Sequence, residues 1–278
     1  MATAESLALV FVAGLATALA TGLGAVPFFV VEEFSDRWNV ALWGLASGIM
    51  VSASLFGLLT EGLAYSASPP TLLLLGLLAG VALVEIGDRL LDAVDVGDNE
   101  ADADHPIEAE AFAEGDPTKL LLILGILTVH SFPEGVAVGV SFADLGLSGG
   151  VPVFGFAVPV LAVFMTVAIS IHNVPEGTAI AIPMRAMGLS NWRMVGAAVF
   201  SSLPQPIGAV IAFAFVRWAR SFLPFGFGFA AGAMIYLVAT EFVPEALEAG
   251  SDLPGGGRRA LVVGFAVGVA VMLPLLAV

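Results

Sequence analysis

The sequence predicts an all-α integral membrane protein with eight membrane-crossing helices. Of its 278 residues, 59% are hydrophobic and only 12% are charged, and the mean hydropathy is +1.00. A soluble domain would carry about 25% charged residues. Apolar runs of about 18 residues or more, long enough to cross a bilayer, recur along the chain between short polar links. The 32 glycines fit this class, because small residues let membrane helices pack closely.

The spans follow from the positions of the polar links. The first covers residues 7–31, and Glu5 stands where a cleaved signal peptide would carry basic residues. A polar link at 32–37 precedes the second span, and a Ser/Pro turn at 66–70 precedes the third. Turns rich in Gly, Ser, Pro or Arg separate the later spans. The second to eighth spans are expected at 40–60, 71–91, 119–142, 151–184, 194–218, 225–247 and 260–278.

An acidic segment interrupts this pattern at residues 93–117. It contains nine Asp or Glu residues and His105, and it has no Lys or Arg. Such a composition predicts a solvated loop within a single transmembrane domain of residues 1–278. The loop either keeps the protein soluble in salt or collects metal ions weakly, and the sequence leaves both readings open.

The basic residues predict the orientation in the membrane. With eight spans both termini lie on one side, and with the termini outside only Arg217 and Arg220 lie on the outer side. The positive-inside rule therefore predicts a multi-pass plasma-membrane protein with extracellular termini and a cytoplasmic acidic loop. The remaining basic residues, which then lie inside, are Arg37, Arg89, Lys119, Arg185, Arg193, Arg258 and Arg259.

One six-residue pattern occurs twice within the apolar spans. It reads His-Ser-Phe-Pro-Glu-Gly at 130–135 and His-Asn-Val-Pro-Glu-Gly at 172–177, and it holds two of the three histidines. Residues four apart lie on one face of a helix, roughly 6 Å apart along its axis, so each copy points a His and a Glu the same way. The intervening proline removes a backbone donor, so we expect the fourth and fifth helices to be broken there.

These side chains predict a divalent-metal site in mid-membrane. Buried charges are costly, and apart from Lys119, the first residue of the fourth span, no Lys or Arg lies within these two spans to pair with the carboxylates. The chain has no cysteine, so ligands must be nitrogen, oxygen or thioether. Two imidazoles and two carboxylates suit zinc or another first-row divalent ion. The principal ligands are expected to be His130, Glu134, His172 and Glu176, with the metal as substrate and no resident cofactor.

Several protein classes are disfavoured. No Glu directly follows either motif histidine, so the zinc-protease pattern HExxH is absent. There is no Walker loop to couple transport to ATP at this chain, and no basic patch to bind nucleic acid. We therefore expect a transporter and not an enzyme.

Further carboxylates near helix ends mark a candidate pathway for the ion. Glu85, Asp88 and Arg89 end the third span at i, i+3 and i+4 spacing, which fits either a salt-bridge cluster or an entry or exit step. Glu241 and Glu245 stand at the end of the seventh span. These four carboxylates are the candidate pathway residues.

The motifs resemble those of the ZIP (Zrt-, Irt-like protein) family of metal transporters, especially its prokaryotic branch, over nearly the whole chain. The matching stretches are 46–53, 130–135, 172–177, 201–209 and 231–245. The resemblance implies a ZIP-type bundle, import of zinc or related ions, often two metal sites, and dimers. It also implies that helices one, four, five and six move against the others.

Two positions depart from the family pattern. Ser131 stands where many prokaryotic members have Asn, and Gln205 where many have Glu. A second site drawing on Ser131, Asn173 and Gln205 has lost a charge and should be weak, so we expect one principal site with these residues peripheral. Met50 is either a thioether neighbour of the site or a packing residue.

The sequence thus favours a secondary importer of divalent metal, foremost Zn²⁺, working by alternating access. A proton-coupled exporter of the same fold is one alternative. A metal-dependent intramembrane hydrolase using metal-bound water is another. A metal-sensing receptor with the acidic loop as its output is the third.

Overall fold

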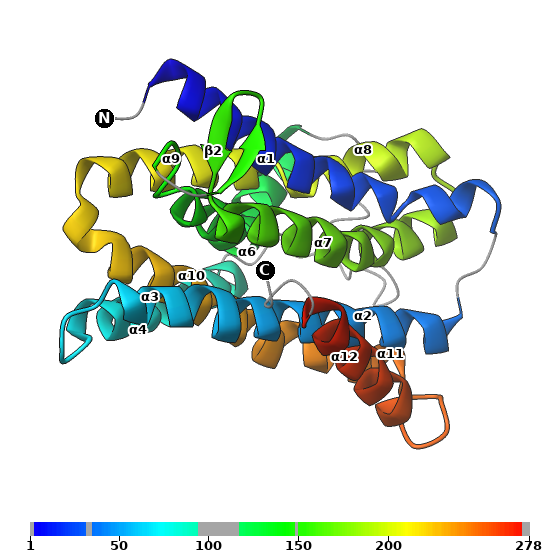
Figure 1. Cartoon of the computed structure of the whole chain (residues 1–278). Coiled ribbons are helices and arrows are strands. Elements are labelled where there is room, and N and C mark those ends of the chain that lie inside the picture. The colour runs from blue at the N-terminus through cyan, green and yellow to red at the C-terminus, as the bar shows by residue number, and fades with distance from the viewer. Residues whose placement is uncertain (1–2, 32–34, 94–116, 148–149, 274–278) are drawn as a thin grey trace.

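The computed structural model describes residues 3–31, 35–93, 117–147 and 150–273, and the side chains of 90–93 and 117–127 are not part of this description. The acidic segment, including His105, lies almost entirely outside the described residues. The described chain is helical except for one hairpin and the connecting turns (Figure 1).

Eight helical segments cross the molecule, as predicted. Within the described residues, six helices are long and apolar enough to span a membrane. The segments are α1 (Ala4–Leu23); α2 (Asp36–Ser52) with η2 (Ala53–Leu59) and α3 (Thr60–Ala64); α4 (Thr71–Ala93); α6 (Pro117–Ser141); α7 (Val160–Ala186); α8 (Asn191–Ser201) with α9 (Pro204–Trp218); α10 (Leu223–Leu237) with η4 (Val238–Phe242) and α11 (Val243–Ala249); and α12 (Arg258–Met272). Short 3₁₀ turns, η1 (Val26–Phe29) and η3 (Arg220–Phe222), follow α1 and α9.

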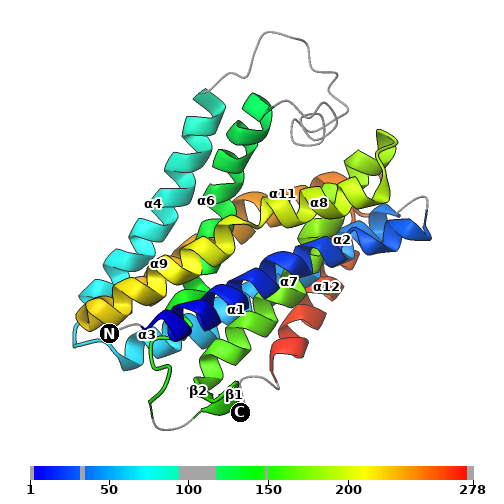
Figure 2. The same cartoon turned by 90° about the horizontal axis from the view of Figure 1, so that it is seen from above.

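The helices form two layers (Figure 1, Figure 2). One layer contains α1, α6, α7, α8 and α9, whose most extensive contacts are α6 with α9 and α1 with α7. The other contains α2, α3, α4, α10, α11 and α12, in which α4 packs on α10 and α2 on α12. This is the same division, helices one, four, five and six against the rest, that the family resemblance implies.

Glycines spaced four apart bring the helices of the second layer into close contact. A carbon added at Gly76 would lie 2.1 Å from the carbonyl oxygen of Phe225, and one at Gly232 would lie 2.2 Å from that of Leu77. Gly44 and Gly48 of α2 meet α12 in the same way, opposite Gly264 and Gly268. Such small-xxx-small spacing lets backbones touch. The contacts advance in the same direction along both helices of a pair, from Leu261 at Gly44 to Phe265 at Gly48 and from Phe225 at Gly76 to Phe229 at Gly80. Both pairs are therefore parallel, and α2 and α12 begin at the same face of the molecule.

We expect Gly232→Val to destabilise the protein by about 2 kcal/mol, because the added carbons must push α4 away from α10. Thermal unfolding of the purified protein in detergent measures this. Gly196→Val on α8 is the matched control, since a carbon there would meet nothing within 4 Å. Equal unfolding temperatures for the two variants would contradict the packing described here.

The expected breaks in the fourth and fifth helices are not found. Both α6 and α7 continue through Pro133 and Pro175, because a proline removes one backbone hydrogen bond without preventing the following turns. The interruptions lie elsewhere, at the π-helical segments η2 and η4 and at the turn between α8 and α9. Single π turns are frequent at functional sites.

The fifth span begins later than predicted. Residues 151–158 form an antiparallel hairpin, β1 (Val151–Val153) with β2 (Phe156–Val158), and α7 starts at Val160. Phe154 and Gly155 both have positive φ, which is typical of a tight hairpin turn. The apolar residues of the hairpin read as a continuation of the helix in the sequence, which explains the error.

A polar contact joins the two layers near the end of α3. Tyr65 donates a hydrogen bond to Asp144, which also pairs with Arg220. Burial and the neighbouring carboxylate raise the pKa of Tyr65 to about 12, so its phenol stays protonated and remains a donor. Tyr65 belongs to the second layer, whereas Asp144 follows α6 of the first.

Candidate metal centre

A buried group of two carboxylates and an imidazole lies between α6 and α7. Glu134 from α6 and His172 from α7 are 2% and 0% exposed, and His172 Nε2 is 2.9 Å from Glu134 Oε1. Glu176, one turn after His172, is half-buried and completes the group. One ligand atom from each of the three residues lies within 4.8 Å of the others. We call this set the buried triad.

The buried triad has donor atoms without protein partners. Glu176 Oε2 and His172 Nδ1 are fully enclosed and make no hydrogen bond. No Lys or Arg among the described residues forms an ion pair with Glu134 or Glu176. A buried charge without a partner is costly unless a cation or a proton compensates it. The arrangement therefore fits the binding of a dication.

His130 does not join this group. Although it precedes Glu134 by four residues on α6, its Nε2 lies 3.5 Å from Asp88 Oδ1 and 3.1 Å from Glu241 Oε1. The contact with Glu241 lacks hydrogen-bond geometry. These three residues form a second group with ligand atoms within 4.8 Å, which we call the outer triad.

The outer triad is more accessible and draws on both layers. The side chains of His130, Asp88 and Glu241 are 25%, 33% and 26% exposed. His130 belongs to the first layer, while α4 and η4 supply the two carboxylates from the second. Gly87 allows α4 to approach α6 beside His130, since a carbon added there would lie 2.5 Å from Val129. His130 and Glu134 belong to different groups because different helices pack against the two turns of α6 that carry them.

The π-helical segment η4 serves both groups with consecutive residues. Glu241 points to His130, and Phe242 stacks on the His172 ring with centroids 5.7 Å apart. Phe242 also contacts Trp43 of α2, at 4.9 Å between centroids. The wider π turn therefore places a ligand and an apolar wall beside the two triads.

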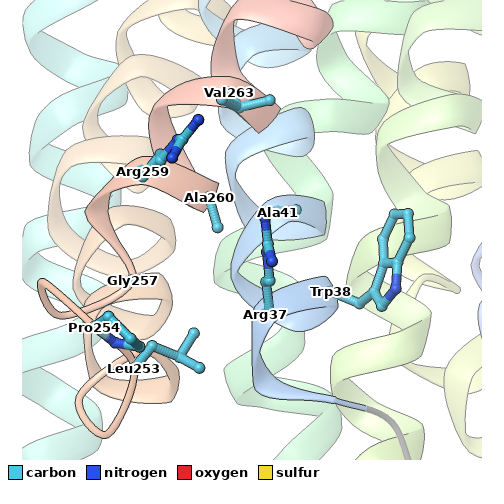
Figure 3. Close-up of a pocket in the computed structure, with 9 residues that line it drawn as sticks. All are labelled: Arg37, Trp38, Ala41, Leu253, Pro254, Gly257, Arg259, Ala260 and Val263. Atoms are coloured by element: carbon cyan, nitrogen blue, oxygen red, sulfur yellow. The ribbon is translucent and has the colours of Figure 1, made fainter.

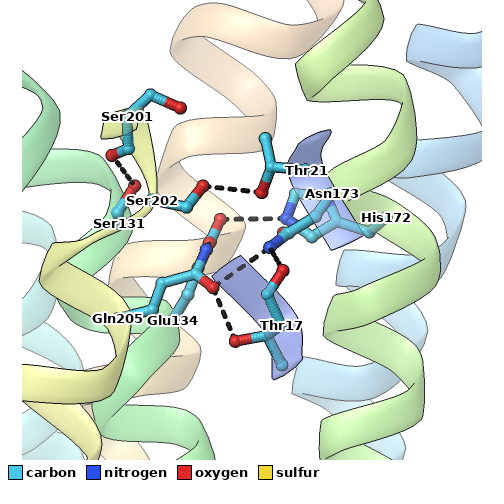
Figure 4. A network of polar contacts seen from close by, with 9 residues as sticks. All are labelled: Thr17, Thr21, Ser131, Glu134, His172, Asn173, Ser201, Ser202 and Gln205. Atoms are coloured by element: carbon cyan, nitrogen blue, oxygen red, sulfur yellow. Dashed lines mark hydrogen bonds and ion pairs between the residues drawn. The ribbon is translucent and has the colours of Figure 1, made fainter. Parts of the chain in front are cut away.

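Neutral polar side chains surround Glu134 (Figure 4). Gln205 donates a hydrogen bond to Glu134 Oε2, so both oxygens of this carboxylate are held in place. The Gln205 oxygen accepts from Thr17 Oγ1 at 2.6 Å and from Asn173 Nδ2 at 3.0 Å. Ser131 instead donates to the Ser201 carbonyl at 3.1 Å. Of the residues predicted as peripheral, Asn173 and Gln205 thus belong to a charge-neutral network beside Glu134, whereas Ser131 bonds the backbone of α8.

Sequence reasoning missed the contribution of α1 to this network. Thr17 bonds Gln205, and Thr21 bonds Ser202 at 2.7 Å, although all four side chains are buried (Figure 4). Two hydroxyls four residues apart on an apolar helix were the available signal, because they share one face.

The remaining predicted residues belong to neither triad. Met50 is buried on α2 within the main apolar core. Glu85 accepts hydrogen bonds from Arg89, at 2.6 Å from Nε, and from Tyr236, so it forms the salt-bridge cluster that was one of the two sequence readings. Glu245 is exposed on α11. Of the four candidate pathway carboxylates, only Asp88 and Glu241 belong to a triad.

The fold and these groups define a class: a multi-pass helical membrane protein with one carboxylate–imidazole cluster inside a helix layer and a second one that joins the two layers. Comparison with known proteins agrees, because the family model described as ZIP Zinc transporter matches residues 93–276. The chain belongs to the ZIP family, which confirms the resemblance seen in its motifs. This membership places it among metal-ion transporters.

Individual relatives carry zinc-transporter names. The chain is 32% identical to zinc transporter ZIPB of Bordetella bronchiseptica, over 94% of this chain and 78% of that protein. It is 29% identical to zinc transporter GufA of Myxococcus xanthus, over 87% of this chain and 89% of that protein. A relative from Arabidopsis thaliana is 37% identical over 85% of this chain, which spans only about a third (34%) of that protein's length.

Proposed function

We propose that this protein is a secondary transporter that imports divalent metal ions, foremost Zn²⁺, through the buried triad. The observation that carries the proposal is the enclosed set of Glu134, His172 and Glu176, with partnerless donor atoms on two of them. Nitrogen and carboxylate oxygen are ligands that zinc takes readily. Two carboxylates also balance the charge of a dication, which lowers the cost of crossing an apolar layer.

The outer triad is proposed as the next binding site on the path of the ion. α4 ends and α6 begins at the same end of the molecule (Figure 2). His130 lies one helical turn, roughly 5–6 Å, nearer that end than Glu134. An ion leaving the buried triad in this direction meets Asp88, His130 and Glu241. Because these residues come from both layers, movement of one layer against the other would open or close the step between the two triads.

The neutral network around Gln205 is proposed to leave the protein with one strong metal site. Its amide donates to Glu134 and so occupies the side on which a second ion would need negative ligands. We expect Gln205→Glu to create a second site. Both proteins would carry His130→Gln, which removes binding at the outer triad. At a zinc concentration where the protein with Gln205 holds about one ion per chain, at the buried triad, equilibrium dialysis should give about two ions per chain for Gln205→Glu. The same stoichiometry in both proteins would contradict this proposal.

Orientation and assembly complete the proposal. The whole chain acts as one transport domain in the plasma membrane, with both termini outside and as a homodimer. The arginine distribution supports the orientation, and the family resemblance supports the dimer. Since the chain has no cysteine, single cysteines introduced near Ala4 and in the 94–116 segment can be labelled cleanly from either side. Labelling of both from the same side would refute the orientation.

Uptake of radioactive zinc into proteoliposomes tests the function itself. We expect wild-type vesicles to accumulate zinc down its gradient, well above protein-free vesicles, with no ATP present. If zinc crosses the membrane only when a proton gradient is imposed, and moves in the direction opposite to the protons, the exporter is favoured. Binding of zinc without any movement across the membrane would favour a sensor or a hydrolase. Either outcome would overturn the proposed function.

A further inference from the structure

A cavity of about 690 Å³ lies between the beginnings of α2 and α12 (Figure 3). Arg37 and Trp38 line it from α2, and Arg259 lines it from α12. Its other walls are mainly apolar, among them Leu253 and Val263. The cavity therefore combines two cations with an apolar surface at one face of the molecule.

Among the described residues, neither of these two arginines has an anionic partner. Elsewhere in the described residues, Arg89 pairs with Glu85 and Arg220 with Asp144. Within the described ranges, the side chains of Arg37 and Arg259 form no ion pair or hydrogen bond, even though Asp36 directly precedes Arg37. Arg185, Arg193, Arg217 and Arg258 also form no ion pair within the described residues, but only Arg37 and Arg259 line this cavity. The cavity is therefore a positive site open to an anion from outside the chain.

The ends of the helices reinforce this charge. α2 and α12 run parallel, so both N-termini point toward the cavity region, and neither has a side-chain cap. Uncapped first-turn N–H groups and the helix dipole both favour a negative group. This effect adds to the two guanidinium groups, which suit the planar, multi-oxygen geometry of a phosphate.

The apolar side of the cavity continues along α12. Val263, Val267 and Val271 are 55%, 48% and 40% exposed and share one face at i, i+4 and i+8 spacing. This row starts at the cavity and follows the helix into the apolar layer. Trp38, 67% exposed at the start of α2, stands where tryptophans mark the membrane–water interface. A small soluble phosphate has no apolar chain to contact these valines, whereas the acyl chain of a lipid would lie along them.

We propose that this cavity binds an anionic glycerophospholipid. Arg37 and Arg259 contact its phosphate, the helix starts add to the positive field, and one acyl chain follows the valine row of α12. The bound lipid would lie on α2 and α12 of the second layer. The inference does not depend on the proposed transport function.

Native mass spectrometry of the purified protein, titrated with phosphatidylglycerol or phosphatidylcholine, tests this site. We expect phosphatidylglycerol to bind at least about tenfold more tightly than phosphatidylcholine, and the Arg37→Gln, Arg259→Gln double variant to lose that preference. Arg193→Gln, which removes an exposed charge from α8, is the control and should keep it. Equal binding of the two lipids, or an unchanged preference in the double variant, would overturn the proposal.

Two further arms separate a lipid from a soluble phosphate. Val267→Ser should weaken phosphatidylglycerol binding while leaving both arginines in place. Glycerol 3-phosphate should compete only at far higher concentration than the lipid. Competition by glycerol 3-phosphate at the lipid's own concentration would show a soluble phosphate site and contradict the acyl-chain contact. Each variant is used only if its unfolding temperature matches that of the wild type. The substituted positions are exposed, so these changes should leave the fold intact.

Discussion

Zinc uptake should fall about a hundredfold or more, measured as kcat/KM in proteoliposomes, when Glu134 is replaced by Gln. The amide keeps the size of the side chain and its contacts with Gln205 and His172, but it removes one of the two charges that balance the ion. Removing one partner from a buried charge pair typically costs about 3–5 kcal/mol. The loss should therefore appear mainly as weaker capture of the ion. Glu134→Ala, Glu176→Ala should abolish uptake.

Glu85→Gln is the matched control for this change. It makes the same chemical substitution on a half-buried carboxylate that Arg89 and Tyr236 already engage. We expect it to retain uptake within about threefold, because surface ion pairs contribute little. Wild-type uptake by a folded Glu134→Gln protein would show that the buried triad does not carry the ion.

The second large effect is expected at His130. Replacing it by Gln should slow maximal zinc uptake about tenfold while changing KM less than Glu134→Gln does. The reason is its exposure: at about one quarter exposed, its place at the outer triad can be taken in part by water. Initial rates measured over a range of zinc concentrations separate the two parameters.

This measurement also distinguishes two arrangements of the ligands. If His130 belonged to one site with Glu134, His172 and Glu176, its substitution should raise KM as strongly as that of Glu134. If it belongs with Asp88 and Glu241, then adding Asp88→Asn to His130→Gln should cause little further loss, since the two residues act at one step. Fully additive losses in the double variant would contradict the outer triad as a unit.

The sequence was sufficient for the number of membrane helices and for part of the site. Span length depends only on local apolar content, so eight segments could be counted without tertiary information. The i, i+4 spacing likewise placed His172 and Glu176 on one face of α7. The spacing could not show which helix faces each turn, because that depends on packing between distant segments. His130 therefore meets Asp88 and Glu241, which lie 42 residues before it and 111 residues after it.

Two local features also lay beyond sequence reasoning. The turn at Phe154 and Gly155 uses positive φ at a phenylalanine, which a composition-based reading does not anticipate. The π-helical segment η4 adds residues to a helical turn without any proline or glycine within Val238–Phe242 to mark it. Both features lie inside predicted spans, at 151–184 and 225–247, and η4 supplies Glu241 to the outer triad.

Anomalous diffraction at the zinc edge, from crystals grown with about one equivalent of Zn²⁺, is the most direct test of the central claim. We predict the strongest peak between α6 and α7, with Glu134, His172 and Glu176 within about 2.0–2.2 Å of the ion. Its loss in Glu134→Gln crystals should accompany the loss of uptake. A strongest peak at the outer triad or elsewhere, with no density among these three side chains, would contradict the buried triad as the transport site.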